Sequence, residues 1–276
     1  MQVPDRLRPA ARSARRLVRR VKNGRNRPEL ERALKRSAEL EKSLAELTAW
    51  RHSRHNDMTD EDRDLIKLAR PYTMTSWDKL TALVLAVRHV GLHVPEGDFV
   101  ECGVWRGGSV HAIARTLMSV GVTDRDIYLF DTFSGMTEPT DRDVDENGRT
   151  AAERLATSSK KARIWALASR EDVEAGLATL DYPQERFHLV EGPVEDTIPA
   201  QAPASIAMLR LDTDWYESTH HELIHLYDRL VSGGVLIIDD YGSWQGSRQA
   251  TDEFLAGLKS PPLMQRAGNA RIGVKP

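Results

Sequence analysis

The sequence predicts an α/β fold: a doubly wound, mostly parallel sheet that is closed by antiparallel strands and preceded by a helical extension. From Phe99 onwards, short apolar runs alternate with longer amphipathic segments. Two of these runs end in paired carboxylates, at Asp212 and Asp214 and at Asp239 and Asp240. If both runs are parallel strands, the four carboxylates meet at one edge of the sheet, where a hard cation such as Mg²⁺, Mn²⁺ or Ca²⁺ would offset their repulsion.

The composition indicates the size of the domain and argues against disulfide-stabilised and membrane-spanning proteins. The 276 residues are enough for one domain of about 200 residues with an extension, and 40% hydrophobic content supports a core. A single cysteine, Cys102, excludes an internal disulfide framework and is compatible with a reducing cytoplasm. No apolar run approaches the roughly 20 residues that span a bilayer, so we expect a cytoplasmic protein.

Residues 1–57 are predicted to form an extension, and residues 58–276 the enzymatic domain. Met1–Arg27 carries ten Arg or Lys residues and one acid, which indicates either a solvated arm or a helix resting on the anionic inner face of the membrane. Because this segment has no aromatic residues, we do not expect nucleic-acid binding. Leucines 30, 34, 40, 44 and 47 predict an amphipathic helix over Pro28–Trp50, which could be the dimer arm of a homo-oligomer, and Arg51–Asp57 is predicted to be a linker.

The domain opens with two helices and a strand–turn–helix unit. Thr59 is placed to cap a helix that runs toward Arg70, and Ser76 to cap another that runs through Val90. The run Phe99–Val104 predicts a buried strand that leads through a glycine-rich turn into a helix over Ser109–Val120. A second strand, Ile127–Phe130, ends at Asp131, which could accept from ribose hydroxyls or cap the following turn.

The acid-rich segment Met136–Arg170 is long and polar, and it predicts a solvated loop that helps to shape a substrate pocket. The elements expected after it are a helix over Arg170–Leu180, a strand over Phe187–Val190, a loop over Glu191–Asp196, a strand over Ile206–Leu211, a helix over Ser218–Leu230, a strand over Val235–Ile238, a helix over Arg248–Leu258, and a hairpin formed by Leu263–Gln265 and Ile272–Val274.

The glycine-rich turn indicates a cofactor without phosphates. A dinucleotide-binding turn would read G-x-G-x-x-G, whereas this one has Glu101 on the strand, followed by Gly103 and Gly107. A buried carboxylate needs a partner, and an ammonium would supply one. S-adenosylmethionine carries an ammonium, a sulfonium and a ribose, and it fits this pattern; a fortuitous buried acid is the alternative.

Five stretches of the chain resemble the macrocin O-methyltransferase family, whose members methylate sugar hydroxyls of macrolide antibiotics with S-adenosylmethionine and Mg²⁺. They are Phe99–Ser109, Tyr128–Phe133, Val194–Pro199, Leu209–Ser218 and Ile237–Tyr241. The resemblance covers roughly Pro71–Pro276, and the arrangement is also similar to that of catechol O-methyltransferases. It implies a Rossmann-like methyltransferase sheet and an O-methyltransferase activity in natural product biosynthesis, with a small-molecule glycoside or glycan as acceptor.

The resemblance also implies roles for individual residues. The metal ligands would be Asp212, Asp239 and Asp240, and the residues around the cofactor would be Met74, Thr75, Glu101, Gly103, Ser109, Asp131 and Glu195. A base must accept the proton of the acceptor hydroxyl, and we expect Asp212 to do so, with Asp214 as the alternative. Three other functions stay open on the Asp-x-Asp pattern or the basic arm: a metal-dependent glycosyltransferase, a phosphatase, or a non-catalytic membrane- or partner-binding scaffold.

Overall fold

The computed structural model describes residues 27–53, 58–160 and 162–276, and within the first range it describes the side chains of residues 32–45. The chain divides into two compact units, Met1–Thr59 and Asp60–Pro276, which we describe separately. The predicted basic arm lies outside the described residues except for Arg27, and so do residues 54–57 of the predicted linker.

In the first unit, the helix α2 (Arg27–Ser53) confirms the helix predicted from the leucine pattern and continues into the predicted linker. Leu34, Leu40 and Leu44 are each more than half exposed. Among the described residues of this unit, no second element packs against this apolar stripe. The predicted role of this helix in a homo-oligomer stays a prediction.

The second unit is built around a seven-stranded sheet with the order β3-β2-β1-β4-β5-β7-β6. The strands are β1 (Asp98–Cys102), β2 (Ile127–Asp131), β3 (Phe187–Glu191), β4 (Ile206–Leu211), β5 (Leu230–Ile238), β6 (Gln265–Ala267) and β7 (Ala270–Val274). The first five are parallel, and β7 pairs antiparallel with both β5 and β6. The predicted fold class is confirmed, including its C-terminal hairpin.

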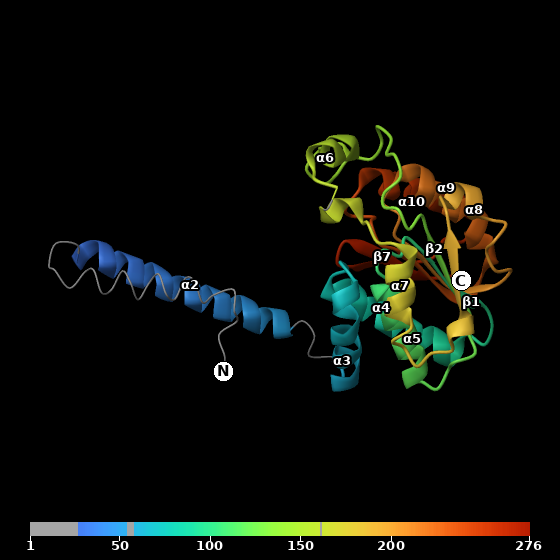
Figure 1. Ribbon diagram of the computed structural model, residues 1–276, viewed down its shortest axis with the longest axis horizontal. Coiled ribbons are helices and arrows are strands. Elements are labelled where there is room, and N and C mark those ends of the chain that lie inside the picture. Colours follow the sequence, from blue (N-terminus) through green and yellow to red (C-terminus); the bar gives the residue numbers. More distant parts are fainter. Residues whose placement is uncertain (1–26, 54–57, 161) are drawn as a thin grey trace. The chain divides into compact units, whose positions relative to one another are not determined.

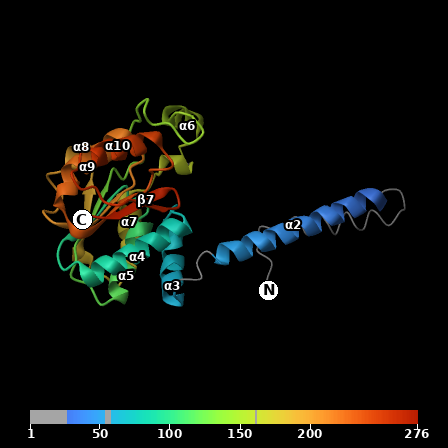
Figure 2. The ribbon, with the colours of Figure 1, turned by 180° about the vertical axis from the view of Figure 1, so that it is seen from behind.

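Helices cover both faces of this sheet (Figures 1 and 2). One face carries α3 (Asp60–Ala69), α4 (Trp77–His93), α5 (Gly108–Ser119) and α7 (Arg170–Leu177), and the other carries α8 (Val194–Thr197), α9 (Tyr216–Leu226) and α10 (Gln245–Ala256). The strand order reverses between β1 and β4. In open α/β sheets, ligands bind beyond the carboxyl ends of the strands at this reversal.

Local capping explains where one of the site-forming helices begins. The Ser76 hydroxyl accepts from the amide of Lys79, so α4 begins at Trp77 as predicted. In contrast, α9 begins two residues before the predicted Ser218 and ends at Leu226, because residues 227–229 form a 3₁₀ turn and Leu230 already belongs to β5. β5 is longer than predicted, because it also contains Leu230 and the Ser-Gly-Gly segment, where its pairing with β4 shifts register.

The prediction that Met136–Arg170 is a solvated loop is wrong. The segment contains the helix α6 (Ala151–Thr157), and its Ala151 and Leu155 pack with Trp215 and Trp244 in a small apolar cluster. Asp143 is fully buried. Its carboxylate accepts, at 2.7 Å, from the amide of Tyr216, which is the first residue of α9. Two of the acids in this segment, Asp143 and Asp145, are therefore buried acceptors for backbone amides, which a composition count cannot distinguish from solvated acids.

Among the helices that the structure describes, none is long and apolar enough to cross a membrane.

Candidate active site

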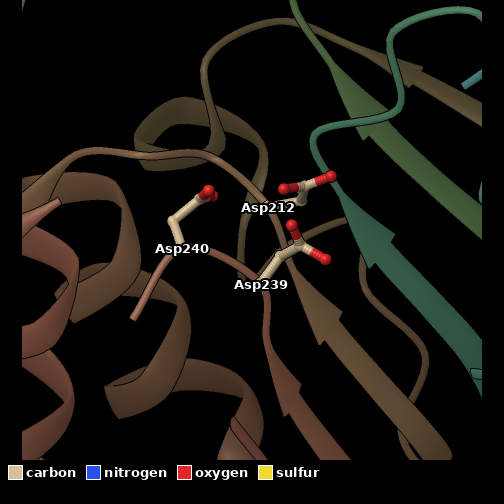
Figure 3. Close-up of side chains that lie close together, drawn as sticks. All are labelled: Asp212, Asp239 and Asp240. Atoms are coloured by element: carbon tan, nitrogen blue, oxygen red, sulfur yellow. The ribbon is translucent and has the colours of Figure 1, made fainter. Parts of the chain in front are cut away.

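Two neighbouring strands bring three aspartates together at the carboxyl edge of the sheet. Asp212 follows β4, and Asp239 and Asp240 follow β5. Leu211 and Ile238 are paired at the ends of these strands, so Asp212 and Asp239 come next to each other. Each of the three aspartates offers one carboxylate oxygen that lies within 4.8 Å of the others (Figure 3).

Two protein cations contact this cluster. The guanidinium of Arg210, in β4, lies 2.8 Å from Asp212 and 2.6 Å from Asp239. The same guanidinium forms a buried ion pair with Glu101 of β1. The ammonium of Lys79, in the first turn of α4, donates to Asp239. Strands β1, β4 and β5 and helix α4 thus meet in one network of charges.

The carboxylates of the cluster differ in how readily they ionise. Burial raises the pKa of Asp239, but the charges of Arg210 and Lys79 outweigh it and lower that pKa to about 2. Burial raises the pKa of Asp212 and of Asp240 well above the usual range, and repulsion from neighbouring carboxylates adds to the effect. An additional cation would relieve this repulsion.

The donor atoms of the cluster fit a hard divalent cation. All of them are carboxylate oxygens, which are the ligands that Mg²⁺, Mn²⁺ and Ca²⁺ prefer. Asp240 Oδ2 is buried, and among the described residues it has no hydrogen-bond partner. A buried acceptor without a partner, in acidic surroundings, indicates a place for a positive ligand. Asp212, Asp239 and Asp240 are therefore able to hold such a cation together.

Asp214, the fourth aspartate, lies beside the cluster on the wall of a cavity. Its backbone adopts a φ of +67°, which is uncommon for a residue other than glycine and is found most often at functional sites. Burial, and then repulsion from Asp212, raise the pKa of Asp214 to about 7. A carboxyl group with such a pKa can accept a proton near neutral pH.

The cavity beside the aspartates has a volume of about 400 Å³, which lies in the range of small-molecule pockets. Its walls include most of the residues expected around the cofactor: Met74, Thr75, Gly103, Asp131 and Glu195. The remaining two, Glu101 and Ser109, are buried and are not among the lining residues. Glu101 faces the protein's own Arg210 instead of the cavity, so its predicted contact with a cofactor ammonium stays a prediction.

Asp131 organises the turn that forms one wall. Its Oδ2 accepts from the amides of Val104 at 2.7 Å and Trp105 at 2.9 Å, and its Oδ1 accepts from that of Phe133 at 2.8 Å. Trp105 and Phe133 both have positive φ angles, 49° and 48°. Asp131 thus holds two strained backbone positions while it lines the cavity. The two roles that the sequence allowed for it are compatible, because each carboxylate oxygen can accept more than one hydrogen bond.

The glycines of the turn allow a close approach between chain segments. Gly103 has a φ of +83°, and a Cβ at this position would lie 2.1 Å from the carbonyl oxygen of Asp212. At Gly108, a Cβ would lie 2.4 Å from Cβ of Thr73. The turn therefore packs against Asp212 at the end of β4 on one side and against the segment before Met74 on the other. Glycine is required at both positions to bring these walls together.

Sequence reasoning missed several residues at this edge. Lys79 carried no signal, since a lysine in the first turn of a helix is ordinarily exposed to solvent. Arg210 did carry one, because it is the single charge in the apolar run Ile206–Leu211 and a buried charge requires a partner. Asn269 lines the cavity from the turn between β6 and β7, a region that the sequence identified only as a hairpin.

Comparisons with known proteins show the family to which this sequence and fold are similar. Residues 16–264 match the family model described as macrocin O-methyltransferase (TylF), so the match begins well before the Pro71 indicated by the motifs. The demethyldecarbamoylnovobiocin O-methyltransferase of Streptomyces niveus is 33% identical over 189 residues, which cover 68% of this chain and 69% of that protein. The mycinamicin III 3''-O-methyltransferase of Micromonospora griseorubida is 31% identical over 190 residues, 66% and 70% of the two chains.

A comparison of structures also finds an O-methyltransferase. The solved structure of the O-methyltransferase NovP superimposes with a TM-score of 0.64 and 29% sequence identity. The superposition covers 74% of this chain and 82% of that one.

Proposed function

The chain belongs to the macrocin O-methyltransferase family, and from this premise we propose that it methylates a sugar hydroxyl of a glycosylated natural product or glycan, using S-adenosylmethionine and Mg²⁺. The observation that carries the proposal is the convergence of Asp212, Asp239 and Asp240 within 4.8 Å at the rim of a cavity whose wall is the glycine-rich turn. The O-methyltransferase class takes the place of the glycosyltransferase, phosphatase and scaffold alternatives, none of which explains this turn.

The acidic wall of the cavity supports the choice of cofactor. Asp131 and Glu195 both line it, and their carboxylates suit hydroxyl and ammonium donors while repelling phosphates. Met74 and Thr75 line the same cavity from the segment before α4. We assign these four residues and Gly103 to the cofactor side, with Glu101 and Ser109 beneath the wall.

The aspartates of the cluster, which line the same cavity, would bind and activate the acceptor hydroxyl. When bound, a divalent cation supplies a Lewis acid that lowers the pKa of a hydroxyl, and the sulfonium supplies an activated methyl group. The protein's contribution is orientation and a base. Asp212 and Asp214 are the candidates for the base. Because Asp212 is already paired with Arg210 and is one of the proposed metal ligands, Asp214, which lines the same cavity, is favoured for accepting the proton.

The decisive experiment compares the purified wild type with Asp212→Asn and Asp240→Asn, and with Asp141→Asn as a matched control on the exposed surface. Each protein is incubated with S-adenosylmethionine, Mg²⁺ and an extract of glycosylated metabolites, and products that gain one methyl group are detected by mass spectrometry. We expect both site variants to lose methyl transfer with unchanged circular dichroism, and the control to retain it. Undiminished turnover in either site variant, or in excess EDTA, contradicts the metal-assisted proposal.

We further propose that residues 1–57 contribute localisation or oligomerisation and that chemistry resides in residues 58–276. The exposed leucines of α2 would suit association with a second copy, and the basic segment before it would suit a peripheral contact with anionic lipid. A protein lacking residues 1–55 is expected to retain methyl transfer. If the truncated protein is folded but inactive, the extension takes part in catalysis and this division is wrong.

A further inference from the structure

Both carboxylate oxygens of Asp239 are engaged by cations of the protein itself. Oδ1 lies 2.6 Å from the guanidinium of Arg210, and Oδ2 accepts from the ammonium of Lys79. Asp239 is also one of the three aspartates that we propose as metal ligands. A divalent cation that approaches Asp239 therefore meets a carboxylate whose negative charge is already compensated on both sides.

The two cations differ in their freedom to move. Arg210 is in the fully buried strand β4, its side chain is 2% exposed, and its guanidinium contacts Glu101, Asp212 and Asp239 at once. Withdrawing it would leave several buried acids unpaired, which is costly. Arg210 is thus a permanent part of the wall.

Lys79 is in a different position. Its backbone is fixed by the cap of α4, where the Ser76 hydroxyl accepts from its amide, but its side chain lines the cavity. The ion pair described for it is the one with Asp239. The side chain is only 10% exposed, but it faces the cavity, and lysine carries a compact charge on a flexible four-carbon stem, so the ammonium can move into the cavity without any movement of the helix.

An ammonium and a divalent cation cannot share one oxygen without strong repulsion. We propose that Lys79 is an exchangeable counter-ion of the carboxylate cluster: it neutralises Asp239 in the metal-free protein and releases Oδ2 when a divalent cation binds. The inference rests on the proposed metal site, and it concerns how the negative charge of Asp239 is compensated before a metal ion binds. Metal affinity is then set by competition with a side chain of the protein.

Competition predicts that removing the ammonium strengthens metal binding. In Lys79→Met, the divalent cation no longer displaces a positive charge, so we expect its Kd to decrease about tenfold or more. The metal-free variant loses the compensation of Asp239, so its melting temperature decreases, and the increase on adding metal exceeds that of the wild type. A lysine that merely positions Asp239 as a ligand would give weaker binding on removal.

The experiment is a calorimetric titration of full-length, chelator-treated protein with Mn²⁺ in the absence of S-adenosylmethionine, with free Mn²⁺ measured in parallel by electron paramagnetic resonance. The proteins are the wild type, Lys79→Met, Lys79→Gln, and Lys67→Met as a control that removes a lysine from an exposed pair on α3. Lys79→Gln retains a donor for Asp239 without the charge, and it serves if the methionine variant does not fold.

We expect both folded Lys79 variants to bind Mn²⁺ about tenfold more tightly than the wild type, and Lys67→Met to bind like the wild type. Equal or weaker binding by the Lys79 variants, while the wild type binds, overturns the counter-ion role and leaves the metal site in place. Absence of Mn²⁺ binding in all four proteins overturns the metal site of the proposed function, and the inference with it.

Discussion

Replacing Arg210 by methionine is expected to destabilise the second unit strongly, although methionine preserves most of the length of the side chain. Arg210 is the shared partner of Glu101, Asp212 and Asp239. Its removal leaves these carboxylates to repel one another, and the loss is greatest where no water or other cation can compensate.

The contacts of each carboxylate show where this loss is concentrated. Asp239 keeps Lys79, and Asp212 has 26% of its side chain exposed and can be hydrated. Glu101 has a side chain that is only 2% exposed, and its other oxygen, Oε2, already lacks a hydrogen-bond partner among the described residues. The expected loss is that of one broken buried ion pair, about 3–5 kcal/mol in the free energy of unfolding. For a unit of this size it corresponds to a decrease in melting temperature of roughly 10 °C.

Urea and thermal unfolding, followed by circular dichroism in EDTA, would measure this loss. The double variant Glu101→Gln/Arg210→Met should recover about 2 kcal/mol relative to Arg210→Met, because removing both partners leaves no unpaired buried charge. Arg63→Met, which breaks an exposed pair with Asp60, serves as the control and should change stability by less than about 0.5 kcal/mol. A loss below about 1 kcal/mol in Arg210→Met, or no recovery in the double variant, would refute the reasoning.

Three further predictions concern other parts of the second unit. Gly103→Ala should lower both the melting temperature and the metal affinity, because its Cβ would lie 2.1 Å from the Asp212 carbonyl oxygen and would displace a proposed metal ligand. Calorimetric titration with Mn²⁺ tests this, and an unchanged affinity counts against the close approach. Asp143→Ala should cost about 1–2 kcal/mol in the free energy of unfolding, because it leaves the buried amide of Tyr216 at the start of α9 without its acceptor. It should also speed proteolysis within residues 136–170; a solvated loop would show neither effect. Burial and then the charge of Arg115 lower the pKa of His111 to about 4, so the free energy of unfolding should decrease as pH falls from about 6.5 toward 4. The melting temperatures of the wild type and of His111→Phe should therefore diverge over this pH range, and a constant difference would exclude the effect.

The predictable part of the candidate site is the part that follows from the ends of parallel strands. Asp212, Asp239 and Asp240 could be placed together because neighbouring parallel strands end at one edge, whatever the details of packing. The glycine-rich turn and Asp131 could likewise be placed on the cavity wall. These inferences needed only the order of the elements and the identity of the residues after each strand.

The partners of these residues could not be predicted. Lys79 reaches Asp239 from a position 160 residues earlier in the chain, and nothing in the sequence of its helix shows that this lysine, and not its neighbour Asp78, faces the sheet edge. Glu101 was expected to meet a cofactor ammonium, but its nearest cation is Arg210, 109 residues later. Contacts at this separation depend on how α4 and β4 pack across the sheet.

By itself, the sequence determined the fold class, the enzyme family and the three aspartates at the sheet edge, because period, strand order and local motifs are properties of the chain read in order. Only the tertiary structure decided the state of charge at that edge. The ionisation of a buried carboxylate depends on the distance to every nearby charge and on the water excluded from it, and both are fixed only when distant segments pack. Packing also gave the acid-rich segment at residues 136–170 a helix and buried side chains where a solvated loop was predicted, while its Met136, Thr137 and Ala166 line the cavity, in agreement with the predicted role in shaping a pocket.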